Sequence, residues 1–188
     1  MSSGVCPWWI GYLLASPIRR LAHDPHAILS PWVGEGMTVL EPGPGMGFFT
    51  LELARLVGER GRVIAIDVQP KMLQELVRRA RRAGLVERIE ARVPRGEGLG
   101  IDDIAGRVDF VLAFAVVHEL PSAEGFFAEA YRALKAGGRL LLSEPAGHVS
   151  EEAFATTLSL AERAGLSIVS RPAIRWSRSA LLVRREPS

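Results

Sequence analysis

The sequence has almost no cysteine and no long apolar run. Its 188 residues include a single cysteine, Cys6, so a fold held together by disulfide bonds is excluded. No apolar stretch reaches the ~20 residues that a membrane-spanning helix requires. Because 48% of the residues are apolar, intrinsic disorder is excluded as well. We therefore expect one domain with a packed core and no membrane partner.

The sequence also lacks a strong excess of either charge. Lysine and arginine number 23 against 21 acidic residues, a net charge of +2, which does not by itself indicate a nucleic-acid partner. The densest basic stretch contains Arg78, Arg79, Arg81, Arg82, Arg88, Arg92 and Arg95. Such a stretch is usually a solvated face, with phosphate or RNA binding as the alternative. No cationic residue precedes the apolar segment around Trp8, so we expect no secretory signal and a cytoplasmic protein.

Short apolar runs alternate with longer amphipathic stretches. The runs predict strands at 38–41, 62–67, 88–93, 109–114, 139–143, 166–174 and 180–184, and the stretches predict helices at 49–57, 70–83, 124–134 and 150–164. Continuous apolar strands separated by helices are typical of a parallel sheet, whereas the last two strands lack a crossover and must be antiparallel neighbours. We predict an α/β fold: a doubly wound, mostly parallel seven-stranded sheet with an antiparallel C-terminal strand and helices on both faces. The core spans 37–188, preceded at 1–36 by a helical segment.

A glycine-rich loop, EPGPGMG at 41–47, follows the first predicted strand and opens the first predicted helix. Glycines at 43, 45 and 47 allow a tight turn and let a ligand approach the main chain. Asp67 ends the next strand, 20 residues beyond Gly47, where a carboxylate can accept hydrogen bonds from a ribose diol; it can also cap the following helix. The pair indicates an adenosine-containing ligand. A dinucleotide fingerprint would need glycine where Phe48 stands, which disfavours NAD.

Four segments follow one another along the chain: VLEPGPGMGFFT at 39–50, VIAID at 63–67, DFVLAFAVVHEL at 109–120 and ALKAGGRLLL at 133–142. Together they resemble, in order, the motifs of the Rossmann-like (class I) S-adenosylmethionine-dependent methyltransferases. The resemblance runs from 37 to 185 and includes the antiparallel C-terminal pair. It implies a small single-domain enzyme whose cofactor is S-adenosyl-L-methionine and whose second product is S-adenosyl-L-homocysteine.

The resemblance also assigns cofactor contacts. Glu41, Gly43, Gly45 and Gly47 would line the methionine portion, Asp67 would hold the ribose hydroxyls, and Val68 would pack on the adenine. The family usually has an acidic residue near the adenine amino group, but Arg95 stands at that place. Glu97 or main-chain groups are the alternatives there. Phe114, at the end of the predicted fourth strand, completes the predicted cofactor-binding set.

The acceptor side is predicted from residues that follow the later strands. His118, after the fourth strand, is either a general base for an oxygen or nitrogen nucleophile or a packing residue. Glu144 and His148 follow the fifth strand and would face the acceptor, together with Trp9 and Tyr12 of the N-terminal segment. The spacing of these histidines and carboxylates matches no metal signature, so we expect no metal.

These features predict a methyltransferase that acts on a small molecule by in-line methyl transfer. Two alternatives remain open: an RNA or protein methyltransferase, and a Rossmann-like protein that binds a cofactor without catalysis or uses NAD. The sequence leaves the accepting atom (O, N, S or C) open.

Overall fold

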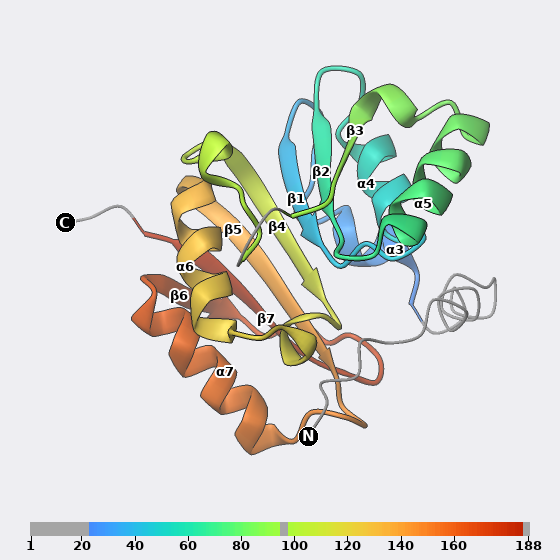
Figure 1. The fold of residues 1–188 in the computed structure, drawn as a ribbon. Helices are drawn as coiled ribbons and strands as arrows, with labels where there is room; N and C mark the ends of the chain where they lie inside the picture. The colour runs from blue at the N-terminus through green and yellow to red at the C-terminus, as the bar shows by residue number, and fades with distance from the viewer. Residues whose placement is uncertain (1–22, 95–97, 186–188) are drawn as a thin grey trace. The chain divides into compact units, whose positions relative to one another are not determined.

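The computed structural model describes residues 23–94 and 98–185, which divide into two compact units with the boundary between Pro94 and Arg95 (Figure 1). Predicted site residues Trp9, Tyr12 and Glu97 lie outside the described residues.

The first unit is built on three parallel strands, β1 (Thr38–Pro42), β2 (Arg62–Ile66) and β3 (Ile89–Arg92). β2 lies in the middle and pairs in parallel with both of the others. Their covering helices are α4 (Thr50–Leu56) and α5 (Pro70–Arg82), which contact β2 and β3 respectively, and a 3-10 turn, η1 (Val86–Arg88), precedes β3. In β1 and β2 the last four residues are all buried, as expected for strands covered on both faces.

Helix α5 follows the prediction closely. Pro70 stands in its first turn, where its missing N–H costs nothing. Met72, Leu73, Leu76 and Ala80 form its buried side, spaced as one apolar stripe. The helix therefore packs against the unit mainly through this one face.

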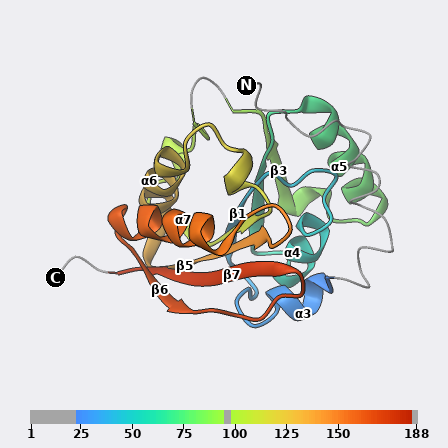
Figure 2. The same cartoon turned by 90° about the horizontal axis from the view of Figure 1, so that it is seen from below.

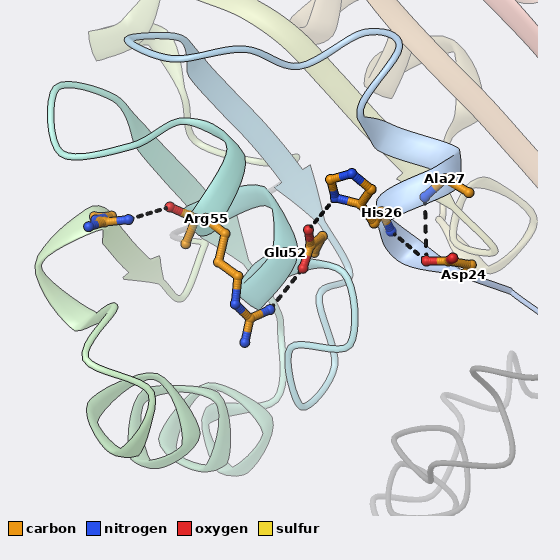
Figure 3. Close-up of polar contacts among 7 residues, drawn as sticks. Asp24, His26, Ala27, Glu52 and Arg55 are labelled. Atoms are coloured by element: carbon orange, nitrogen blue, oxygen red, sulfur yellow. Dashed lines mark hydrogen bonds and ion pairs between the residues drawn. The ribbon is translucent and has the colours of Figure 1, made fainter.

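A short helix, α3 (Pro25–Leu29), lies against α4. Asp24 caps it by accepting the main-chain N–H groups of His26 and Ala27. Figure 3 shows how His26 reaches Glu52 of α4, with 2.9 Å between Nδ1 and Oε1, while Arg55 pairs with the other carboxylate oxygen of Glu52 at 2.8 Å. The contact between His26 and Glu52 therefore holds α3 against α4 within the first unit.

The second unit contains β4 (Val108–Phe114), β5 (Leu134–Pro145), β6 (Leu166–Ser170) and β7 (Ser177–Arg184). β4 and β5 are parallel, whereas β7 runs antiparallel to both β5 and β6. Helices α6 (Ala123–Ala133) and α7 (Glu151–Arg163) contact each other and lie along the same side of β5 and β7 (Figure 2). Two 3-10 turns, η2 (Asp102–Ile104) and η3 (Val117–Glu119), flank β4.

The predicted fold class is confirmed. Seven strands form a mixed sheet in the order β3-β2-β1-β4-β5-β7-β6, and β7 is the reversed strand between two neighbours. The boundaries that differ most from the prediction belong to the last three strands. β5 begins at Leu134, because this residue already pairs with Val108, β6 ends at Ser170 rather than at 174, and β7 begins at Ser177 rather than at 180. Among the described residues, no helix combines the length and apolarity needed to cross a bilayer.

Candidate functional site

The glycine-rich loop of the first unit has a left-handed backbone at three alternate positions. The φ angles of Gly43, Gly45 and Gly47 are 64°, 54° and 84°, a region that L side chains enter only at a cost. The N–H of Gly43 donates to the carbonyl of Ile66 at 2.8 Å, which ties the loop to the end of β2. The turn required by the sequence is therefore present between β1 and α4.

The loop glycines differ in what surrounds them. A Cβ at Gly47 would lie 3.1 Å from the Cγ of Leu76 on α5, whereas at Gly45 no atom of the described residues would lie within 4 Å. Gly47 thus permits close packing of loop and helix, and Gly45 borders open space. Glu41, the first residue of the glycine-rich segment 41–47, lies at the carboxyl end of β1, and its side chain is buried.

Asp67 stands directly after β2. Its Oδ1 accepts the main-chain N–H of Gln69 at 2.8 Å, so the side chain is held in a turn between the strand and α5. The N-cap of α5 is Gln69, without a side-chain cap bond; Asp67 fixes the turn before the helix rather than capping it. Beside it, Val68 is 62% exposed, an apolar side chain at the surface next to a positioned carboxylate.

Arg79 is a feature of this region that the sequence did not single out. Its Nη1 donates to the main-chain carbonyl of Met46, inside the glycine-rich loop, at 2.6 Å. Arg78, its neighbour, pairs instead with Glu75 on its own helix. Leu76 and Arg79 are three residues apart and therefore lie on the same face of α5. Because Leu76 packs next to Gly47, this spacing is the sequence signal that could have indicated the contact of Arg79 with the loop.

In the second unit, the chain turns sharply where β4 ends at Phe114. Ala115 has a φ of 55°, an uncommon and costly conformation for a residue with a side chain. Its N–H donates to the carbonyl of Ser143 on β5 at 2.7 Å. The turn leads directly into η3, which carries His118.

His118 and Glu144 form a close pair. Their Nδ1 and Oε2 atoms are 2.5 Å apart, and the second carboxylate oxygen of Glu144 accepts the N–H of Val117 at 2.8 Å. Glu144 is only 1% exposed, whereas a quarter of the His118 side chain reaches solvent. The imidazole thus lies between a buried carboxylate and the surface.

The carboxylates around His118 raise its pKa above the ordinary value of 6.5. The main cause is the hydrogen bond to Glu144, with the charges of Glu144 and Glu119 adding to it, while burial acts in the opposite direction. Glu119 lies 3.8 Å from the other ring nitrogen, Nε2.

His148 lies beside this pair, since its ring centroid is 6.4 Å from that of His118. Arg178 on β7 holds the loop that carries it: Nε donates to the carbonyl of Val149 at 2.9 Å, and Nη1 pairs with Glu151 at 2.8 Å. The structure therefore brings His118, Glu144 and His148 together. Within the described ranges 23–94 and 98–185, no three His, Cys, Asp or Glu side chains are arranged to hold a metal ion.

The comparison with known families decides the assignment. The sequence model of the methyltransferase domain matches residues 34–173, a range that includes the glycine-rich loop, Asp67, His118 and Glu144. The chain belongs to this methyltransferase family. The resemblance to S-adenosylmethionine-dependent methyltransferases, and the expectation of an enzyme of that family, are thereby confirmed.

Relatives agree with the assignment. A ubiquinone/menaquinone biosynthesis C-methyltransferase from Klebsiella pneumoniae is 34% identical over 112 residues, which are 60% of this chain and 44% of that protein. The matched part of the methyltransferase domain thus spans less than half the length of this relative. A S-adenosylmethionine-dependent methyltransferase from Aquifex aeolicus is 26% identical, with a TM-score of 0.84 over 96% of this chain and 100% of that one.

The fold alone does not fix the reaction. A structure described as a [4+2]-cyclase matches with a TM-score of 0.70, at 15% identity and over 96% of both chains. Because one fold hosts several chemistries, the reaction of this methyltransferase domain depends on the residues at its own site.

Proposed function

We propose that the chain binds S-adenosylmethionine through its first unit and catalyses transfer of the methyl group to a small molecule. The observation that supports this most strongly is the left-handed glycine loop, tied to Ile66, with Asp67 held at the end of the neighbouring strand. A main-chain turn beside a positioned carboxylate suits an adenosyl ligand that carries a ribose diol.

The residues present fit this cofactor. Open space borders Gly45, and the buried carboxylate of Glu41 suits the charge of an amino group. Asp67 would accept the ribose hydroxyls, and the exposed Val68 would be covered by the adenine. Arg79 would keep the loop in place through Met46. Contacts from Phe114 and Glu97 stay predictions.

When bound, the cofactor supplies an electrophilic methyl group on a positively charged sulfur. The protein then has two tasks: to align the acceptor and to remove its proton. We assign the removal of the acceptor's proton to His118. Its ring reaches the surface of the second unit, and its protonated form is stabilised by the neighbouring carboxylates. His148 lies close enough to the same ring to contact the acceptor.

A small-molecule acceptor is favoured by two observations. The Klebsiella pneumoniae relative is named for a carbon methylation in quinone biosynthesis. In addition, Arg78, Arg79, Arg88 and Arg92 each bind a carboxylate or a carbonyl of the first unit, which leaves the basic stretch poorly suited to a nucleic acid. Acceptor contacts from Trp9 and Tyr12, and a cytoplasmic location, stay predictions.

Calorimetric titration with S-adenosylhomocysteine, S-adenosylmethionine and NAD tests the proposal. We expect saturable micromolar binding of the first two and none of NAD. Asp67→Asn serves as the matched variant because it keeps an oxygen for the Gln69 N–H while losing the charge. Binding of NAD in place of the sulfur-containing ligands would contradict the proposal.

A further inference from the structure

In the second unit, the hydrogen bonds of the Glu144 carboxylate determine which ring nitrogen of His118 carries the proton. Glu144, at the end of β5, is 1% exposed. One of its oxygens accepts the N–H of Val117, and the other lies 2.5 Å from Nδ1 of His118. The two groups are 26 residues apart in sequence, and the parallel pairing of β4 with β5 brings them together.

An ionised carboxylate can only accept hydrogen bonds. Since the N–H of Val117 already donates to one oxygen, the contact at the other oxygen requires a proton on Nδ1 of His118. A neutral imidazole carries one proton, so Nε2 is then the acceptor nitrogen. The geometry thereby selects one of two tautomers.

We propose that Glu144 is a positioning residue, which holds His118 in the tautomer whose Nε2 removes the proton of the methyl acceptor. This inference rests on the proposed function and changes the predicted role of Glu144, from contacting the acceptor to acting through His118. The residue that touches the acceptor is His118.

The charged groups that face the imidazole agree with this assignment. Glu119 of η3 lies on the Nε2 side at 3.8 Å, and His148 stands next to the ring. Arg178 is the cross-strand partner of Glu144, but its guanidinium binds Val149 and Glu151 instead. Glu144 is therefore directed to His118, and it compensates the positive charge that the ring acquires on taking a proton.

The step defines a class of acceptor. The acceptor's O–H or N–H bond breaks, its proton moves to Nε2, and the electron pair stays on the acceptor. That electron pair, or a carbon atom of the acceptor conjugated to it, forms the bond to the methyl carbon. The electron pair of the broken C–S bond stays on the sulfur, which becomes a neutral thioether. The substrate is accordingly a molecule with an ionisable O–H or N–H group at, or conjugated to, the methylated atom.

Nitrogen-15 NMR of the full chain, labelled at histidine, tests the tautomer directly. His118→Gln identifies the signals, because the sequence contains only four histidines. At a pH above the His118 pKa, we expect the neutral ring of the unsubstituted protein to carry its proton on Nδ1. A proton on Nε2 would overturn the proposal, whatever the variants do.

Glu144→Gln adds a second test. The amide oxygen can still accept the Val117 N–H, so the amide NH2 then faces His118 and forces the proton to Nε2. The matched control is Glu119→Gln, which removes a negative charge near the same ring but no bond to Nδ1. We expect Glu144→Gln to invert the tautomer and lower the His118 pKa, whereas Glu119→Gln keeps the tautomer. Unchanged spectra in folded Glu144→Gln would refute the inference.

Turnover and cofactor binding separate this inference from the proposed function. Loss of a general base lowers the rate by about 10²–10⁴-fold, so Glu144→Gln should lower kcat by about a hundredfold or more with unchanged affinity for S-adenosylhomocysteine. If the chain binds no S-adenosyl compound but His118 carries its proton on Nδ1, the cofactor assignment fails, whereas the positioning of His118 by Glu144 is still supported. If it binds the cofactor and Glu144→Gln keeps full turnover, the inference fails alone.

Discussion

The candidate sites of the two units of this methyltransferase domain consist of different kinds of group, main chain in one and side chains in the other. In the first unit the site is mainly backbone: three left-handed glycines, a carbonyl held by Arg79, and Asp67 fixed by the N–H of Gln69. In the second unit it is a pair of side chains, His118 and Glu144, held by one hydrogen bond between them. The first site thus depends mainly on main-chain conformation, whereas the second depends on two side chains that the pairing of β4 with β5 brings together.

This difference predicts different sensitivities. The first unit should respond to changes that alter main-chain geometry or the ribose contact, and its loss should appear in ligand affinity. The second unit should respond to changes in charge, and its loss should appear in pH dependence and turnover.

In the first unit, Asp67→Ala should weaken cofactor binding more than any other single substitution considered. Hydrogen bonds to a charged group contribute about 1.5–3 kcal/mol each, so losing the ribose contact should weaken S-adenosylhomocysteine binding by about a hundredfold or more. Calorimetry of the folded variant measures this. An affinity equal to that of the unsubstituted chain would remove Asp67 from the site.

Gly45→Ala tests whether the main-chain conformation of the glycine-rich loop contributes to cofactor binding. Both Gly45 and Gly106 have positive φ, 54° and 65°, and an added Cβ would meet nothing within 4 Å among the described residues at either position. Each substitution should cost about 1–2 kcal/mol of unfolding free energy through strain alone, measured with urea. Only Gly45→Ala should also weaken cofactor binding, and equal binding by the two variants would contradict a role for the loop.

Arg79→Ala should have a smaller effect, because the loop keeps its other contacts. The lost bond to the Met46 carbonyl should weaken cofactor binding about tenfold, in line with one charged hydrogen bond. The matched control is Arg78→Ala, which removes the pair with Glu75 on the same helix, worth about 0.3–0.5 kcal/mol of stability. If Arg78→Ala weakens binding as much as Arg79→Ala, the loop contact is not the cause.

The smallest effect concerns pH and stability in the second unit. Because the folded-state pKa of His118 is raised above 6.5, its pairing stabilises the protein fully below about pH 6.5 and loses that contribution as the pH rises through the folded-state pKa. The difference in unfolding free energy between the unsubstituted chain and His118→Gln should shrink over that range. Turnover should rise over the same range, because only the neutral ring accepts a proton. A difference that grows with pH would contradict the raised pKa.

The sequence was informative where local rules decide the structure. The glycine spacing at 43, 45 and 47 predicted the turn, and the apolar stripe of α5 predicted that helix to within one residue. Both depend on residues close in the chain.

The start of β5 and two side-chain contacts depend on residues that are far apart in the chain and that the sequence alone does not pair. β5 begins at Leu134, five residues before the predicted strand at 139–143, because Val108 of another strand pairs with Leu134. The contacts of Arg79 with Met46 and of His118 with Glu144 join residues 33 and 26 positions apart. Their residue types were visible, but their partners were set by the sheet and by helix packing.

In the proposed function, the loop at 43–47 and Asp67 together hold the cofactor. An amide NMR titration of the full chain with S-adenosylhomocysteine tests this assignment residue by residue. We expect saturable shifts that are largest at Gly43–Gly47 and at Asp67 and Val68. Saturable shifts elsewhere that leave these residues unchanged, or no shifts at all, would contradict it.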